Sequence, residues 1–134
     1  MLAASLGTPY EVRTEGTLLF IEDIAAKPYQ IDRMLMQLKY AGKLDHIKGI
    51  IFGEMIECIQ ERAQTYTLQE VIMRVLEDFD FPVCYGLRSG HVSSGNITLP
   101  LGVQTQFVVS ENNVDLEICE GATIRSAGTR AVTS

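Results

Sequence analysis

Apolar residues in the first half of the chain follow two different patterns. Residues Leu18–Ile21 are apolar at consecutive positions, which predicts a short strand buried on both faces. Further on, apolar residues recur at i, i+3, i+4 and i+7, which predicts one buried face of a helix. These residues are Ile31, Met34, Leu35 and Leu38. We expect the helix to begin near Pro28, since a first helical residue needs no N–H, and to be closed by Gly42.

A second strand and a second helix follow. Residues Ile47–Met55 form another largely apolar run. Thr67–Glu70 matches a capping box, in which the Thr and Glu side chains bond to each other's backbone N–H groups. A second helical stripe begins there and comprises Leu68, Val71, Ile72 and Val75. Glu70 and Arg74 are spaced for an i, i+4 ion pair on the exposed side.

The last part of the chain shows strand patterns only. Residues Phe81–Tyr85 predict a third short strand, and three later segments are apolar or alternate between turn residues. These are Ile97–Leu101, Val103–Val109 and Val114–Ile118, with a hairpin loop at 111–113. Strand–helix–strand–helix–strand followed by a meander predicts an α/β domain with a mixed sheet and two main amphipathic helices. Small polar residues from 126 to 134 predict a frayed tail.

Composition narrows the class of protein. A chain of 134 residues is one ordinary domain. The net charge of −6 and the lack of a basic stripe argue against nucleic-acid binding. No apolar run approaches the roughly 20 residues that a membrane-spanning helix needs, and the first residues do not resemble a secretion signal. The three cysteines (Cys58, Cys84 and Cys119) fit neither a disulfide framework nor a metal motif, so we expect a cytoplasmic protein.

Two acidic residues lie at a position where binding and catalytic groups are common in α/β folds. Glu22 and Asp23 directly follow the first predicted strand, and ligands of open α/β sheets gather at the carboxyl ends of strands. Adjacent strand residues point to opposite faces, so at most one of the two should face a given site. On pattern alone, the plainer interpretation is that both carboxylates only cap or solvate the next turn.

His91 is the better candidate for a general base. It lies in the glycine-rich loop 86–95 after the third predicted strand, whereas His46 lies among charged neighbours and is expected to face solvent. Ser93 and Ser94 are close enough in sequence to be considered as nucleophiles, but no Gly-x-Ser-x-Gly elbow surrounds them. Ser89 is a further serine in this loop.

A reactive cysteine and a zinc site find little support in the sequence. Cys84 lies inside an apolar strand, which is typical of an inert core thiol. Two histidines without metal-ligand spacing make a zinc site improbable. Asp32 and Arg33 are interpreted as part of the solvated face of the first helix.

Several segments resemble one enzyme family in the same order along the chain. They are residues 14–23, 27–38, 41–44, 49–53, 82–86, 90–91 and 96–102. Together these segments resemble the LD-carboxypeptidases (muramoyltetrapeptide carboxypeptidases), to which the microcin C immunity peptidases are related. The resemblance is to the C-terminal domain alone and covers nearly the whole of residues 1–134.

The resemblance implies a fold, a reaction and roles for two residues. The family's C-terminal domain has a swivelling β/β/α fold and supplies the Glu and His of a Ser-Glu-His triad. By this resemblance Glu22 orients the imidazole and His91 is the general base, while the serine belongs to an N-terminal domain. The implied reaction releases terminal D-alanine from murein tetrapeptides during peptidoglycan recycling and needs no metal or other cofactor. Because the serine belongs to the N-terminal domain, the chain alone is expected to be inactive.

The expected partners are a murein peptide, the N-terminal serine domain and a second copy of the chain in a homodimer, with neither nucleic acid nor membrane. Three alternatives remain open: a stand-alone binding or dimerisation module without catalysis, a microcin-immunity-type peptidase domain, and a nucleophile within the chain at Ser93 or Ser94.

Overall fold

The computed structural model describes residues 1–60, 65–111, 113–121 and 123. Its centre is a parallel sheet of three strands in the order β1 (Leu18–Ile21), β2 (Gly49–Gly53) and β3 (Val83–Leu87). Helix α1 (Pro28–Tyr40) connects β1 to β2, and helix α2 (Leu68–Leu76) connects β2 to β3. A short 3-10 helix, η1 (Ala3–Ser5), precedes β1.

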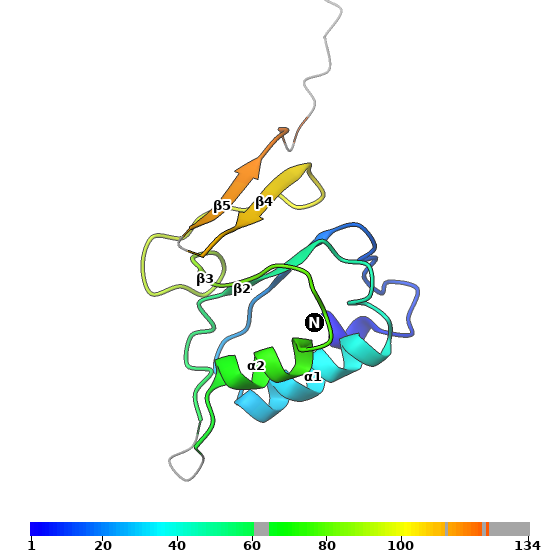
Figure 1. Ribbon diagram of the computed structural model, residues 1–134, viewed down its shortest axis with the longest axis vertical. Helices are drawn as coiled ribbons and strands as arrows, with labels where there is room; N and C mark the ends of the chain where they lie inside the picture. Colours follow the sequence, from blue (N-terminus) through cyan, green and yellow to red (C-terminus); the bar gives the residue numbers. More distant parts are fainter. Residues whose placement is uncertain (61–64, 112, 122, 124–134) are drawn as a thin grey trace, which may run out of the picture.

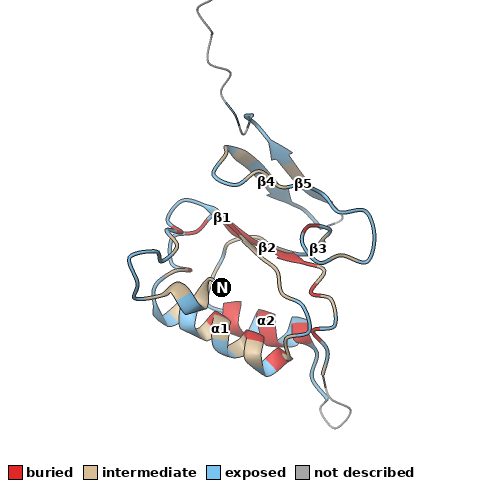
Figure 2. Ribbon diagram, turned by 180° about the vertical axis from the view of Figure 1, so that it is seen from behind, coloured by how far each residue is buried: buried red, intermediate tan, exposed pale blue. Residues whose placement is uncertain are grey.

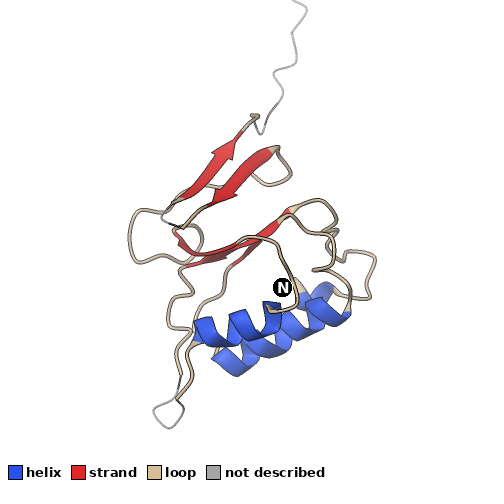
Figure 3. Ribbon diagram, viewed as in Figure 1, coloured by secondary structure: helices blue, strands red, loops and turns tan. Residues whose placement is uncertain are grey.

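The elements stack in three layers. Both helices lie on one side of the parallel sheet, and an antiparallel hairpin of β4 (Thr105–Val109) and β5 (Val114–Ile118) lies on the other side (Figures 1 and 3). The hairpin packs closely on the sheet, since a Cβ atom at Gly49 would lie 3.0 Å from the Phe107 ring. A glycine in the central strand thus makes room for the aromatic side chain of the outer layer.

Both helices form where the apolar pattern predicts them. Pro28 is the first residue of α1, and Gly42 adopts a left-handed conformation (φ +69°) just beyond its end. Thr67 caps α2 as expected, because its hydroxyl accepts the Glu70 N–H at 3.1 Å and the Glu70 carboxylate accepts the Thr67 N–H at 2.7 Å.

The prediction of a single mixed sheet is wrong for the described residues. Parallel and antiparallel pairs occur, but in two separate sheets, and β4 pairs only with β5. Residues Ile97–Leu101, predicted as a strand, are irregular. Ile97 donates its N–H to the carbonyl of Arg88 at 2.7 Å, so this segment folds back on the loop that precedes it instead of joining a sheet edge.

The third strand begins and ends two residues later than predicted. Its first residue, Val83, follows Pro82, which has no N–H for a sheet but whose carbonyl accepts the Ile50 N–H at 3.0 Å. Its end includes Gly86, which apolar patterning cannot assign to a strand. The predicted tail at 126–134 lies outside the described residues.

The predicted ion pair between Glu70 and Arg74 is also wrong. The capping box holds the Glu70 carboxylate at the helix start, and Arg74 reaches across to Asp32 of α1 at 2.8 Å. Asp32 therefore links the two helices instead of being merely solvated.

The core lies between the helices and the parallel sheet (Figure 2). The residues that face it from α1 include Ile31, Leu35 and Leu38, each 2% exposed, and Phe52 of β2 is fully buried. Within the described ranges, no helix is both long enough and apolar enough to cross a bilayer.

Replacing Leu35 with Ala is expected to lower the free energy of unfolding by about 2–5 kcal/mol, because it removes buried apolar surface and leaves a cavity. Urea denaturation followed by circular dichroism measures this loss. Met73→Ala on α2 is the control, since Met73 is 55% exposed and its loss should change stability by no more than about 0.5 kcal/mol. Equal losses in the two variants would contradict the core described above.

Candidate active site

The carboxyl ends of the parallel strands bring two glutamates and one loop together. Glu22 directly follows β1 and Glu54 directly follows β2, while the loop that begins at Arg88 follows β3. The register pairs Ile21 with Phe52, so the residues after these strands lie at the same edge of the sheet. This is the edge at which open α/β sheets hold their ligands.

Glu22 and His91 are in direct contact at this edge. The Nδ1 atom of His91 lies 3.0 Å from Oε1 and 3.2 Å from Oε2 of Glu22, and the backbone N–H of His91 donates to Oε1 at 3.1 Å. The two residues are 69 positions apart in the sequence. The side chain of Glu22 is only 14% exposed, whereas that of His91 is 59% exposed.

This contact defines the tautomer of the imidazole. An ionised carboxylate can only accept hydrogen bonds, so Nδ1 carries a proton and donates it to Glu22. In the neutral ring the lone pair is then on Nε2, which forms no hydrogen bond with any described residue. An exposed histidine in this state can take a proton from a hydroxyl group that faces Nε2.

Two glycines make the space for the Glu22 side chain. A Cβ atom at Gly53 would lie 2.7 Å from Cγ of Glu22, and one at Gly90 would lie 2.7 Å from its carboxyl carbon. Real Cβ atoms do not approach other atoms so closely. Gly90 also has a φ of +98°, which disfavours any other residue there. Glycine at both positions thus allows the carboxylate to reach His91.

A β-bulge directs the chain after β3 toward the glutamates. Tyr85 pairs with Phe52, but the next pair is Leu87 with Gly53, so Gly86 (φ +93°) is an extra residue in β3. The loop that follows closes on itself, because the Asn96 side chain bonds both the N–H and the carbonyl of Gly90 at 3.3 and 3.0 Å. Sequence reasoning did not identify Asn96, whose role depends on a contact within an irregular loop.

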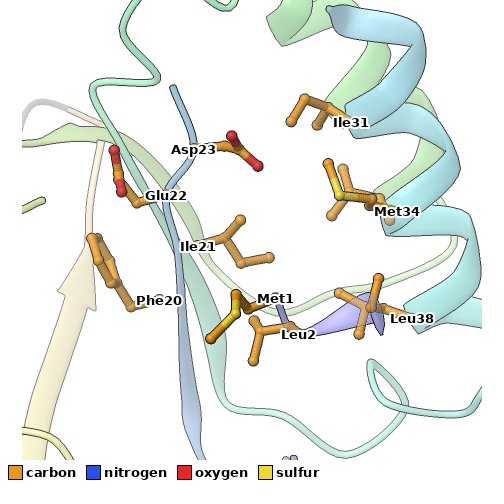
Figure 4. Close-up of a pocket in the computed structure, with 11 residues that line it drawn as sticks. Met1, Leu2, Phe20, Ile21, Glu22, Asp23, Ile31, Met34 and Leu38 are labelled. Carbon is orange, nitrogen blue, oxygen red and sulfur yellow. The ribbon is translucent and has the colours of Figure 1, made fainter. Parts of the chain in front are cut away.

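Asp23 is separated from Glu22 as strand alternation predicts. The two carboxylates point to opposite sides of the end of β1, with Asp23 toward the helices (Figure 4). Asp23 accepts the N–H of the next residue, Ile24, at 2.8 Å, which is the capping role of the plainer interpretation. His46 is exposed, as expected.

An apolar cavity of about 320 Å³ lies on the Asp23 side of β1, between η1 and α1 (Figure 4). Its walls are mainly aliphatic; they include Asp23 and Glu22 but no His, Ser or Cys side chain.

None of the described serines near His91 in the sequence is hydrogen-bonded to its ring. Ser93 donates its hydroxyl to Oε1 of Glu54 at 3.0 Å, and Ser89 is buried. Among the described residues no serine hydroxyl is hydrogen-bonded to the imidazole.

Two of the thiols are at least partly shielded from water, and the acidic groups of the described residues do not gather into a metal site. Burial raises the pKa of the Cys84 thiol and that of the Cys58 thiol, which disfavours the reactive thiolate form. In the described part of the chain, no three His, Cys, Asp or Glu side chains form a group that could hold a metal ion.

Comparison with known proteins places this chain in a family. Residues 1–107 match the family description "LD-carboxypeptidase C-terminal domain". A probable murein peptide carboxypeptidase of Bacillus subtilis is 38% identical over 125 residues, which are 91% of this chain and 39% of that protein. The microcin C7 self-immunity protein MccF of Escherichia coli is 31% identical over 103 residues, or 76% of this chain and 29% of that protein.

A solved structure agrees with these sequence matches. The crystal structure of muramoyltetrapeptide carboxypeptidase from Oxalobacter formigenes superimposes with a TM-score of 0.79 at 31% identity, covering 88% of this chain and 41% of that one. The chain thus spans about two fifths of the length of these carboxypeptidases. From the matched residues and the shared fold, the chain belongs to the LD-carboxypeptidase family, in which it corresponds to the C-terminal domain.

Proposed function

We propose that this chain is the C-terminal half of a serine LD-carboxypeptidase that releases terminal D-alanine from murein tetrapeptides. The observation that carries the proposal is the 3.0 Å contact between Nδ1 of His91 and Glu22 in a chain of this family. The name of the Bacillus subtilis relative, a probable murein peptide carboxypeptidase, supports the choice of substrate. The three-layer arrangement supports the swivelling β/β/α fold that the resemblance implies.

In the proposed reaction, His91 accepts a proton and then donates it, once in each of the two steps. Nε2 takes the proton of the serine hydroxyl while the serine oxygen attacks the carbonyl carbon next to D-alanine. The tetrahedral intermediate then collapses, the C–N bond breaks, and His91 gives the proton to the leaving amine. Water hydrolyses the acyl-serine by the same proton path.

Glu22 has two tasks in this scheme. Its carboxylate keeps the proton on Nδ1, and it stabilises the imidazolium that forms in each transition state. Because the Glu22 side chain is largely shielded from water, its interaction with the cation is screened less than at an open surface. We place the reaction in peptidoglycan recycling in the cytoplasm, carried out by a homodimer.

A microcin-immunity-type peptidase is the second candidate. The Escherichia coli self-immunity protein is 31% identical to this chain over 103 residues, so the same Glu22–His91 pair could act on another acyl substrate. A module without catalysis is the third candidate. Assays with a murein tetrapeptide and with an aminoacyl nucleotide side by side separate the three.

The purified 134-residue chain is expected to release no D-alanine from a murein tetrapeptide, because the resemblance assigns the serine to another domain. Fusion to the N-terminal part of the Bacillus subtilis relative should restore release, measured by a coupled D-amino-acid oxidase assay. The same fusion with His91→Ala is the control and should stay inactive. Release by the chain alone would reveal a nucleophile within it, and a folded but inactive fusion would favour the binding module.

In the two-domain enzyme, Glu22→Gln is expected to lower kcat by about 10⁴, because the amide keeps the size but loses the charge that sets the tautomer. Asp23→Asn is the matched control and should change kcat by less than about tenfold. His91→Ala should be at least as damaging as Glu22→Gln, and the double variant should lose little more. Steady-state kinetics measure all four, and equal losses for Glu22→Gln and Asp23→Asn would contradict the assigned roles.

A further inference from the structure

We infer that Glu54 is a positioning residue for His91: its carboxylate holds the histidine loop through Ser93, and so determines where the imidazole stands. This inference rests on the proposed function for its catalytic consequence. The structural part, that Glu54 anchors the loop, stands independently of any activity.

Both oxygens of Glu54 are engaged by one residue of the loop. The backbone N–H of Ser93 donates to Oε2 at 2.7 Å, and the Ser93 hydroxyl donates to Oε1 at 3.0 Å. Hydrogen bonds to a carboxylate are shorter and stronger than those between neutral groups. Since both oxygens already accept hydrogen bonds from Ser93, Glu54 anchors the loop and is not available as a general base.

The backbone of Glu54 is itself held firmly. Its carbonyl accepts the Tyr85 hydroxyl at 3.4 Å, and the Tyr85 ring stacks on Phe52 of the core. The next residue, Met55, is 3% exposed and adopts a left-handed conformation (φ +51°), which the surrounding packing must maintain. The carboxylate therefore projects from a segment whose neighbour Met55 is buried and whose carbonyl accepts from Tyr85.

The loop needs such an anchor because little else fixes its tip. It has no regular secondary structure between Arg88 and Thr105, and Gly90 and Gly95 both adopt left-handed conformations. Glycines in loops carry a large conformational entropy. The Asn96 side chain closes the loop at Gly90, but its hydrogen bonds go to neither His91 nor Ser93.

Two glutamates thus hold alternate residues of one loop. Glu22 binds His91 and Glu54 binds Ser93, and the two carboxylates come from the ends of adjacent parallel strands. One attachment alone would let the loop turn about the Glu22 contact. The second attachment removes this rotation and fixes the direction of Nε2, which must meet the serine of the other domain.

The kinetic test uses the two-domain enzyme with Glu54→Ala, Glu54→Gln and Ser93→Ala. Glu54→Ala is expected to lower kcat by about 10–100-fold with KM changed less than about threefold, because misplacing a catalytic group by about 1 Å costs up to 10²-fold. Glu54→Gln, whose amide oxygen can still accept from Ser93, should recover part of this loss. Ser93→Ala keeps the 2.7 Å N–H bond and should lose less than Glu54→Ala.

Glu57→Gln is the matched control. Glu57 is an exposed acid in the same loop after β2, and its carboxylate forms no hydrogen bond with the described residues. It should leave kcat unchanged. Equal losses in Glu57→Gln and Glu54→Gln would mean that only the local negative charge matters, and would overturn the inference.

A second measurement needs no activity. Amide hydrogen exchange by NMR on the 134-residue chain should speed up at both Ser93 and His91 in Glu54→Ala, by about tenfold for the loss of one hydrogen bond. The amide of Ile50, in the core sheet, is the internal reference and should not change. Faster exchange at Ser93 with none at His91 would overturn the inference. Faster exchange at both residues, together with no peptidase activity in the two-domain fusion, would refute only the proposed function.

Discussion

The parallel pairing of β1, β2 and β3 is the constraint on which the site depends. Parallel strands end at the same edge, so Glu22, Glu54 and the His91 loop meet there although up to 69 residues separate them in the sequence. The core beneath, formed by Phe52 and the apolar faces of the helices, keeps the three strand ends in register. No one of these elements could bring the imidazole to its carboxylate by itself.

The sequence predicted the elements that apolar periodicity defines and the two residues that the family resemblance supplies. Both helices were correct because their stripes and caps are local signals. Residues Ile97–Leu101 were predicted wrongly because alternation does not reveal which strand, if any, a segment will pair with. The predicted Glu70–Arg74 ion pair does not form, because Glu70 caps the start of α2 and Arg74 binds Asp32 of α1. Residue spacing alone does not show which of these partners a side chain will prefer.

The contacts that build the rest of the candidate site could not be predicted from the sequence. Gly53 lies in a predicted strand and Gly90 in a predicted loop, and both belong to segments that resemble the family, but only the structure shows that they make room for the Glu22 side chain. Glu54 and Ser93 are 39 residues apart, and neither belongs to a motif. Such contacts arise only when strand ends and loops are already in place, so they are a result of the tertiary fold.

The long separation of Glu22 and His91 also has a consequence for how the protein is made. A growing chain exposes Glu22 well before His91 leaves the ribosome, and the sheet edge that brings them together is complete only when β3 pairs with β2. Contacts between distant residues close late because the intervening chain must first lose its freedom. A chain cut short before β3 would carry Glu22 without His91, so incomplete products of synthesis would lack this contact.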